Sequence, residues 1–341
     1  MSVSFAIVAL GVLIVLHELG HFWVARAMGM RVVRFSVGFF RGIWSYTSKK
    51  SGTVYQLGIM PLGGFVQIKG MNPFEEDAHT DPASYQNQSV LRRFLVLLAG
   101  PGANLIAAFL TLFILYASSG TPRYLDKAGV GTVVPGSPAA TAGLEQGDEI
   151  LTADGKPLGS WEDLTTVLRA SPGRKVALEV RRDESRMVLF VTPKDENGIG
   201  KIGIGQPQEF IAMPVHLAAV AAAIKCYQVV AGSLVSIGKM VTFQTSEVQA
   251  VALPGIVKMA ANALDTGLRE FFAFLAYLSL MLFLFNLLPF PALDGGRGIF
   301  LLYEVITRRK VNAKVDVIVN SVGFFLLLGL LIVMSIRDFI N

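Results

Sequence analysis

Apolar runs of about 20 residues recur along this chain of 341 residues, with polar stretches between them. A helix needs about 20 apolar residues to cross the hydrocarbon core of a bilayer, so runs of this length predict membrane spans. Four runs meet this description, at residues 3–25, 94–117, 271–291 and 315–336. The pattern predicts a polytopic α-helical membrane protein with four transmembrane helices.

A shorter apolar segment at residues 54–70 has a different pattern. It is β-like, and Pro61 followed by Gly63 and Gly64 excludes a regular helix. We expect a membrane-associated β-hairpin that dips toward the bilayer. A hairpin on the solvent side is the alternative.

Residues 214–243 form a long segment with a helical pattern, which Lys225 and Lys239 interrupt. Charges on one face of an apolar helix favour a position in the membrane surface. We expect an amphipathic helix lying on the membrane, and a fifth span is the alternative.

Between the second and third spans the chain becomes polar and alternating. Turn residues separate short strand-like runs from one helical stretch, which predicts a small mixed α+β domain. The strands are expected at residues 131–134, 149–153, 176–181 and 187–192, and the helix at residues 161–170. The stretch "PGSPAATAGLEQGDEILTADGKPL" closely resembles a PDZ domain, and such domains bind extended peptide ends at a sheet edge.

Composition agrees with a membrane protein that carries one soluble part. Hydrophobic residues make up 52% of the chain and charged residues 16%, and the mean hydropathy is +0.54. The formal charge of +5 does not require a nucleic-acid partner, because basic residues flank membrane spans. The single cysteine excludes an intrachain disulfide.

Basic residues gather in the loop after the first span and in the loop after the third. Such loops face the cytoplasm, so the N-terminus, residues 121–270 and the C-terminus are expected outside. The residues are Arg26, Arg31, Arg34, Arg41, Arg92, Arg93, Arg297, Arg308, Arg309, Lys310 and Lys314.

The first span contains the sequence H-E-x-x-H at His17, Glu18 and His21. Residues four apart share one helix face, so both imidazoles can reach one metal ion. A metal such as zinc activates water, and the glutamate can take its proton. The motif occurs by chance in soluble proteins, but ionisable residues inside a span are costly and mark function by default.

A catalytic zinc site usually has a third protein ligand. Asp294, in "NLLPFPALDGGR" at the end of the third span, is the conspicuous acidic candidate, and a helix N-cap is the other interpretation. The histidines and Asp294 share a membrane depth only if an odd number of crossings separates their spans. Four spans satisfy this condition, and a crossing by residues 214–243 would break it.

Four features in this order identify the chain as a member of the site-2 protease family, of the bacterial regulator-of-sigma-E type. They are "HELGH", "GPGAN", a PDZ domain and "NLLPFPALDGG". The resemblance covers nearly the whole chain. The best-known proteobacterial members have two PDZ domains in tandem, whereas one is expected here.

The resemblance implies a role for each matching residue. His17, His21 and Asp294 would bind one Zn2+ per chain, and Glu18 would be the catalytic base. Other residues would contact substrate, and a late PDZ strand would bind peptide. The substrate residues are Asn286, Asn104, Pro289, Pro291, Gly63 and Gly64; the PDZ groove residues are Gly203, Ile204 and Gly205.

The resemblance also implies the activity, partners and location. The chain would cut single-span membrane proteins, such as anti-sigma factors and signal-peptide remnants, after another protease has trimmed them. It would lie in the bacterial inner membrane, with the PDZ domain periplasmic and the zinc site toward the cytoplasm. The lipid bilayer and a C-terminal peptide would be further partners, and nucleic acid would not.

The expected domains are a protease core at residues 1–120 and 263–341, a PDZ domain at 121–207 and surface helices at 208–262. Two other functions compete with the protease. A PDZ scaffold with a structural metal would not need Glu18. A prenyl-protein peptidase would be expected to use a distal glutamate rather than Asp294, and to lack a PDZ domain.

Overall fold

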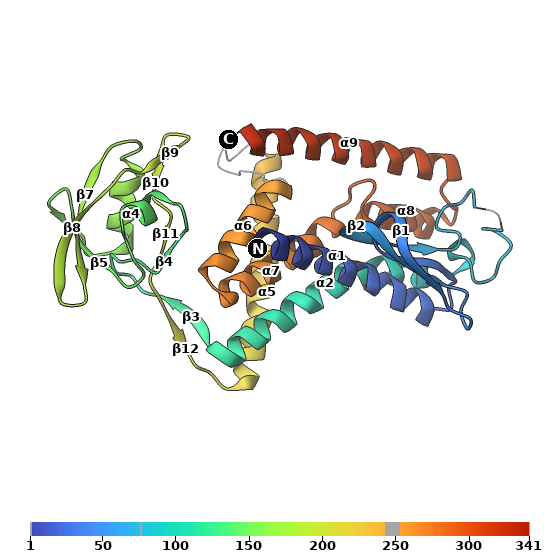
Figure 1. Ribbon diagram of the computed structural model, residues 1–341. Helices are drawn as coiled ribbons and strands as arrows, with labels where there is room; N and C mark the ends of the chain where they lie inside the picture. The colour runs from blue at the N-terminus through green and yellow to red at the C-terminus, as the bar shows by residue number, and fades with distance from the viewer. Residues whose placement is uncertain (1, 76, 243–252, 341) are drawn as a thin grey trace. The chain divides into compact units, whose positions relative to one another are not determined.

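A computed structural model describes residues 2–75, 77–242 and 253–340 (Figure 1). The chain divides into two compact units. The helical unit contains the described residues of 1–113, 222–261 and 272–341, and the strand-rich unit contains residues 114–221 and 262–271.

Four long apolar helices correspond to the four expected spans. They are α1 (Ser2–Ala27), α2 (Val90–Ser119), α7 (Leu268–Leu287) and α9 (Ala313–Ile340). The third ends four residues before the predicted boundary, because Pro289 and Pro291 cannot continue a helix. In contrast, α2 continues through Pro101 as one helix.

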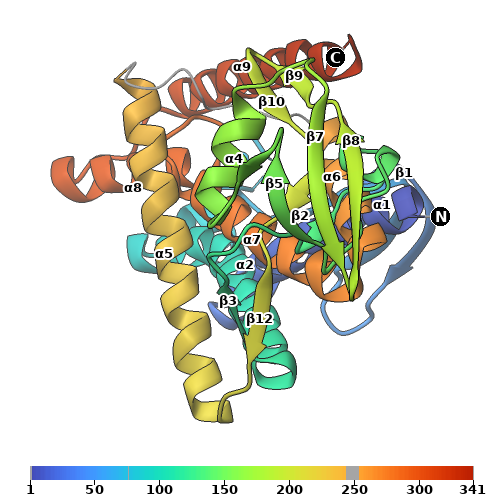
Figure 2. The ribbon, with the colours of Figure 1, turned by 90° about the vertical axis from the view of Figure 1, so that its left-hand side faces the viewer.

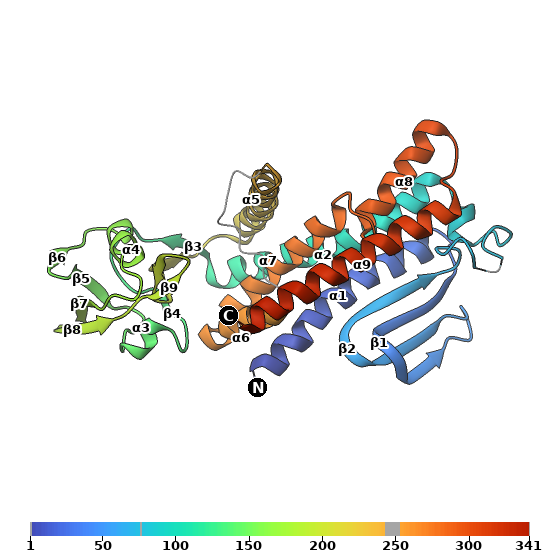
Figure 3. The same cartoon turned by 90° about the horizontal axis from the view of Figure 1, so that it is seen from above.

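The segment expected as a membrane-surface helix is also a long helix, α5 (Val215–Val241). Among the described residues, five helices including α5 are long and apolar enough to cross a membrane, so four is not established as the number of spans. In the helical unit α5 runs across the direction of α1, α2 and α9 (Figures 1 and 3). It packs on α7, where the Ser233 hydroxyl donates to the Met281 sulfur at 3.7 Å.

Three shorter helices lie before, between or after these long helices in the chain. They are η1 (Tyr85–Asn87), α6 (Leu253–Thr266) and α8 (Asp294–Thr307). The far end of α8 is tied to the start of α2 by an ion pair of 2.6 Å between Arg93 and Glu304. Both side chains are largely buried, so this link fixes α8 against α2.

A small sheet lies beside α1, formed by β1 (Val32–Thr47) and β2 (Val54–Ile68) (Figure 3). Both strands bend, and residues 34–37 pair with residues 54–57 on one side and 64–67 on the other. Residues 42–47 pair with 54–58, so the order across the sheet is 42–47, 54–58, 32–37, 64–68. The segment 64–68 is therefore an outer edge. The strand at 32–47 was not expected, although its β-branched and aromatic residues are typical of strands.

The strand-rich unit has its own core of buried aliphatic residues from its strands, loops and helices. Its largest sheet has the order β6-β5-β7-β8, and Figure 2 shows β5, β7 and β8 side by side near α4. The strands expected at 149–153, 176–181 and 187–192 are confirmed as β5, β7 and β8. The elements are β3 (Thr121–Tyr124), β4 (Thr132–Val133), α3 (Pro138–Thr141), β5 (Glu149–Ala153), β6 (Lys156–Pro157), α4 (Trp161–Arg169), β7 (Val176–Arg182), β8 (Ser185–Val191), β9 (Lys194–Glu196), β10 (Ile199–Lys201), β11 (Ile204–Gly205) and β12 (Gln208–Ile211).

Candidate metal centre

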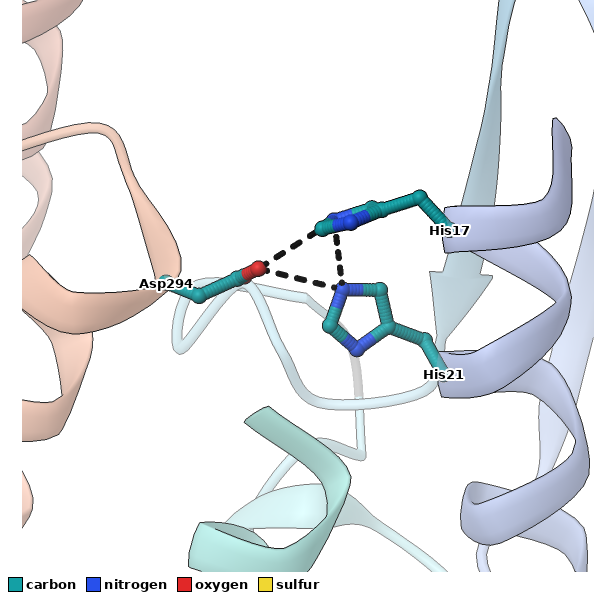
Figure 4. A group of neighbouring side chains, drawn as sticks. All are labelled: His17, His21 and Asp294. Atoms are coloured by element: carbon teal, nitrogen blue, oxygen red, sulfur yellow. Dashed lines mark hydrogen bonds and ion pairs between the residues drawn. The ribbon is translucent and has the colours of Figure 1, made fainter. Parts of the chain in front are cut away.

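Three potential ligand atoms converge within the helical unit (Figure 4). The Nε2 atoms of His17 and His21 lie 3.2 Å apart, and Asp294 Oδ2 lies 3.2 and 3.3 Å from them. Both histidines are buried. Within the part of the chain that the structure describes, these residues form the one cluster of three or more His, Cys, Asp or Glu side chains with this convergence.

The helix α1 places the two histidines because they are four residues apart on one face. His21 Nδ1 lies 2.7 Å from the carbonyl oxygen of Val96. A carbonyl can only accept, so His21 Nδ1 carries the proton and Nε2 of the neutral ring has a free lone pair. This arrangement is typical of a histidine that binds a metal through Nε2.

The other histidine is held by Asn104 on α2. This side chain is completely buried, and its amide lies 3.2 Å from His17 Nδ1. Its backbone carbonyl accepts a hydrogen bond of 2.8 Å from Ser279 on α7. Asn104 therefore connects α1, α2 and α7, and its fully buried side chain contacts His17 rather than presenting a surface to substrate.

The distances fit a zinc ion. Zinc–ligand bonds of about 2.0–2.1 Å with tetrahedral angles place the ligand atoms about 3.3–3.4 Å apart. The three separations are 3.2, 3.2 and 3.3 Å. Asp294 Oδ2 is buried and accepts no hydrogen bond from any residue that the structure describes. An orphaned carboxylate oxygen facing imidazole lone pairs is the environment that a cation stabilises.

Gly100 on α2 borders the cluster directly. A Cβ atom at this position would lie 2.2 Å from His21 Nε2 and 2.7 Å from His17 Nε2. Any side chain would therefore occupy the space in front of both metal-facing nitrogens. Gly100 was not predicted individually, although it begins the stretch "GPGAN" that carries part of the family resemblance.

Glu18 projects toward the small sheet. Its Oε2 accepts a hydrogen bond of 3.1 Å from the backbone N–H of Val66, on the outer edge of β2. It remains within electrostatic reach of both histidines and Asp294. The carboxylate is thus fixed beside the cluster by a backbone group, and Val66 was not anticipated because its contribution is independent of its side chain.

Asp294 reaches the cluster from an irregular turn. After α7 ends at Leu287, residues 288–293 lead into α8, whose first residue is Asp294. The N-cap position is Leu293 and it makes no side-chain cap, so Asp294 does not have the capping role considered as the alternative. Its side chain points instead at the histidines (Figure 4).

The expected substrate contacts are distributed around this turn and the small sheet. The Asn286 amide donates to the carbonyl of Leu282 in its own helix at 2.9 Å. Pro289 and Pro291 belong to the irregular turn. Gly63 and Gly64 lie in β2, and a Cβ at Gly64 would be 3.7 Å from Glu18 Cγ.

The expected peptide groove lies in the strand-rich unit. Ile204 and Gly205 form β11, which pairs with Val133 and Thr132 of β4. Gly203 precedes it with a φ of +79°, and an added Cβ would clash with Ser137. The three residues therefore pack closely on β4 and the start of α3.

A cavity of about 700 Å³ runs along the outer edge of the small sheet. One wall is the edge segment from Phe65 to Ile68, and the other includes Asp316 and Asn320 of α9 and Arg297 of α8. Because Val66 contributes to this wall, the cavity borders the residue that holds Glu18.

Comparison with known proteins gives a family for the whole chain. A family model described as peptidase family M50 matches residues 5–330. A protein of Clostridium perfringens whose name describes a zinc metalloprotease is 36% identical over 343 residues, with 100% of this chain and 99% of that protein covered. The regulator of sigma-E protease RseP of Escherichia coli is 29% identical over 440 residues, with 98% and 97% covered.

Solved structures match part of the chain. The PDZ domain of an SdrC-like protein from Listeria monocytogenes covers 25% of this chain and 90% of its own length. The identity is 23% and the TM-score is 0.22.

Proposed function

This chain belongs to peptidase family M50 and is a metallopeptidase, and from that premise we propose that it hydrolyses peptide bonds in the transmembrane segments of single-span membrane proteins. The observation that carries the proposal is the convergence of His17, His21 and Asp294 among helices long and apolar enough for a bilayer. A hydrolytic centre in that position can reach a substrate that is itself embedded in the membrane.

One zinc ion per chain would be held by His17 Nε2, His21 Nε2 and Asp294 Oδ2. When bound, zinc acts as a Lewis acid and lowers the pKa of water toward 7. The names of the relatives and the ligand separations both support this metal. Two imidazoles and one carboxylate are also a ligand set that zinc accepts.

Glu18 is the proposed base. It takes a proton from the attacking water and later gives a proton to the leaving amine. Its hydrogen bond to the Val66 N–H orients the carboxylate beside the two histidines. A peptide lying along the outer edge of β2 would pass next to this carboxylate.

Val96 and Asn104 would fix the two imidazole tautomers. The Val96 carbonyl accepts from His21 Nδ1. An Asn104 amide with its oxygen toward His17 would do the same for Nδ1 of that ring. This orientation exchanges the amide nitrogen with Asn104 Oδ1, which has no hydrogen-bond partner among the described residues in its present position. Both Nε2 lone pairs would then be available to hold the metal.

The substrate would bind as an extended strand along β2. A helix hides its carbonyls in its own hydrogen bonds, so a transmembrane substrate must unwind before water can attack. No described strand pairs with the outer edge at residues 64–68, and this edge and the adjoining cavity support this mode of binding. Asn286, Pro289, Pro291, Gly63 and Gly64 remain proposed substrate contacts.

The strand-rich unit would act as a PDZ-type domain that binds or screens substrate ends, with Gly203, Ile204 and Gly205 along its groove. In this proposal α5 lies on the outer membrane surface, and four helices span the inner membrane. The strand-rich unit is then periplasmic and the zinc site lies toward the cytoplasm. Trimmed anti-sigma factors and signal-peptide remnants are the proposed substrates.

The decisive experiment is cleavage of a tagged single-span protein, already stripped of its outer domain, with bound zinc measured in each variant. Glu18→Gln should keep zinc and lose activity by about 10²–10⁴-fold, because only proton transfer is removed. Asp294→Asn should lose both. Cleavage by Glu18→Gln at the wild-type rate would eliminate Glu18 as the base. Metal retention without cleavage by any form would favour a scaffold.

A further inference from the structure

Ala292 has an unusual backbone conformation for a residue with a side chain. Its φ is +75°, in the left-handed region, and it lies two residues before Asp294. The Cβ of an L-residue crowds the carbonyl oxygen in this region, so alanine does not adopt it readily on its own. A contact from elsewhere in the helical unit must hold this residue in place.

That contact comes from α9. The backbone N–H of Ala292 donates to Asn320 Oδ1 at 3.0 Å. The other amide atom, Nδ2, donates to the carbonyl oxygen of Asp316 at 2.9 Å and to its carboxylate at 2.6 Å. The two Asp316 oxygens can only accept, so they determine which end of the Asn320 amide faces Ala292.

The same face of α9 touches the neighbouring residue of the turn. Gly323 is buried, and a Cβ added there would lie 2.4 Å from Pro291 Cβ and 2.6 Å from the Pro291 carbonyl oxygen. Asn320 and Gly323 are three residues apart and therefore share one helix face. One provides a hydrogen bond to the turn and the other provides the space for its backbone.

We propose that Asn320 is a positioning residue for the metal centre. Its hydrogen bond holds Ala292 in the left-handed conformation, and this conformation directs the chain so that Asp294 faces His17 and His21. The strength with which the third ligand is held is then set by α9, which contributes no ligand. The inference rests on the proposed function of the cluster as a zinc site.

The test compares the full-length wild type in lipid nanodiscs with Asn320→Ala, Ala292→Gly and the double variant. The readouts are the rate of zinc loss to a chelator and the separate values of kcat and KM. Asn320→Ala should release zinc about 5- to 30-fold faster, as expected from the cost of an unsupported left-handed alanine. The value of kcat should fall with the loss of zinc, and KM is measured separately because Asn320 also lines the cavity beside β2.

Glycine adopts positive φ without this cost, so the second substitution should compensate for the first. Ala292→Gly alone should behave like the wild type, and the double variant should return to within about threefold of the wild-type zinc release rate. Val322→Ala, at an exposed position on α9 outside the lining of the cavity, is the matched control and should change nothing. Should Asn320→Ala fail to fold, Ala292→Val offers a second route, because a β-branched residue is strongly disfavoured at this φ.

The outcomes distinguish failure of the positioning role of Asn320 from failure of the proposed zinc site. Wild-type zinc release from Asn320→Ala would overturn the positioning role and leave the zinc site intact. Faster release that Ala292→Gly does not correct would also overturn it, because Asn320 would then act through helix packing. A wild-type chain that binds no zinc would overturn the proposed function and the inference together.

Discussion

The candidate metal centre has two halves that are built in different ways. Two of its ligands, His17 and His21, come from one regular helix, where their spacing alone places them on one face. The third, Asp294, follows an irregular turn between α7 and α8, where Ala292 has a positive φ. The helical half is ordered by its own backbone hydrogen bonds, whereas the turn depends on a contact from α9.

This difference indicates where the centre is robust and where it can be adjusted. In the helical half, the positions of His17 and His21 are sensitive to added side-chain volume, because α2 approaches the histidines so closely that only glycine fits at position 100. In the turn, the position of Asp294 is sensitive to changes in backbone conformation, because it depends on residues that lie outside the cluster. Substitutions that act on one half at a time should therefore have effects of different kinds and sizes.

The largest effect is expected from Gly100→Ala. The new methyl group would overlap the metal-facing nitrogens of His17 and His21 and displace them. Bound zinc should be nearly lost, and activity should fall at least about 100-fold, since displacements of about 1 Å have such consequences. Zinc content and cleavage of a single-span substrate measure the two effects.

Gly102→Ala is the matched control for this prediction. It makes the same change two residues later on α2, where a Cβ would meet nothing within 4 Å. If both variants lose zinc equally, general damage to α2 explains the loss, and the steric argument at Gly100 is wrong.

A smaller effect in the same half is expected from Asn104→Leu. This change removes the amide that contacts His17 Nδ1 while keeping a buried side chain of similar size. Loss of such an indirect contact typically weakens metal binding by about 10–100-fold. Zinc titration in the presence of a competing chelator measures it. Ser279→Ala removes only the bond to the Asn104 backbone and should weaken zinc binding far less; an equal loss would contradict the tautomer role.

Glu304→Gln acts on the half of the centre that contains Asp294, at the C-terminal end of α8. This change weakens the ion pair between Arg93 and α8, ten residues or about 15 Å beyond Asp294. The helical unit should lose about 1–3 kcal/mol of stability, the usual range for a hydrogen bond involving charge. Zinc release should change less than about threefold, because the turn itself retains its contact with Asn320. Thermal unfolding and chelator-driven zinc loss test the two parts, and a large zinc effect would show that α8 rather than α9 positions Asp294.

The smallest effect on zinc is expected from Arg182→Met in the strand-rich unit. Arg182 donates to both carboxylate oxygens of Asp148, at 2.7 and 2.8 Å. Burial alone would raise the pKa of Asp148, but the hydrogen bonds from Arg182 and the Glu145 N–H outweigh it and lower that pKa. The ionised pair therefore stabilises the unit at neutral pH, and this contribution is lost as the pH falls below the usual aspartate range.

Hydrogen exchange of residues 143–150 between pH 3 and pH 7 measures this contribution. The variant should exchange faster at pH 7, by the equivalent of about 1–3 kcal/mol, and should show a weaker dependence on pH. Zinc binding in the helical unit should be unchanged. An altered zinc affinity would mean that the two units are energetically coupled.

The sequence predicted the regular parts of the molecule because their physics is local. Apolar runs marked the long helices to within a few residues, and alternation marked β5, β7 and β8. The H-E-x-x-H spacing placed His17 and His21 together because a helix has a fixed period. Asp294 could be selected because it is an acidic residue at the end of an apolar run.

The remaining features depend on contacts that no local pattern encodes. Val66 acts through its backbone N–H, which every residue except proline possesses. Gly100 matters only because α2 crosses the histidines at that point. The strand at 32–47 was overlooked although its composition favours β structure. The number of spans also stays a prediction, because α5 is apolar enough to cross a bilayer but runs across the other helices.

The absence of a side chain at Gly100 has a practical use. A single added methyl group is expected to inactivate the chain while Glu18, the three ligands and the outer edge of β2 all keep their identities. Such a variant would retain the surface that a substrate meets, without the means to cut it. Expressed in cells with a photo-crosslinker near residues 64–68, it would serve as a trap that accumulates uncut natural substrates for identification by mass spectrometry.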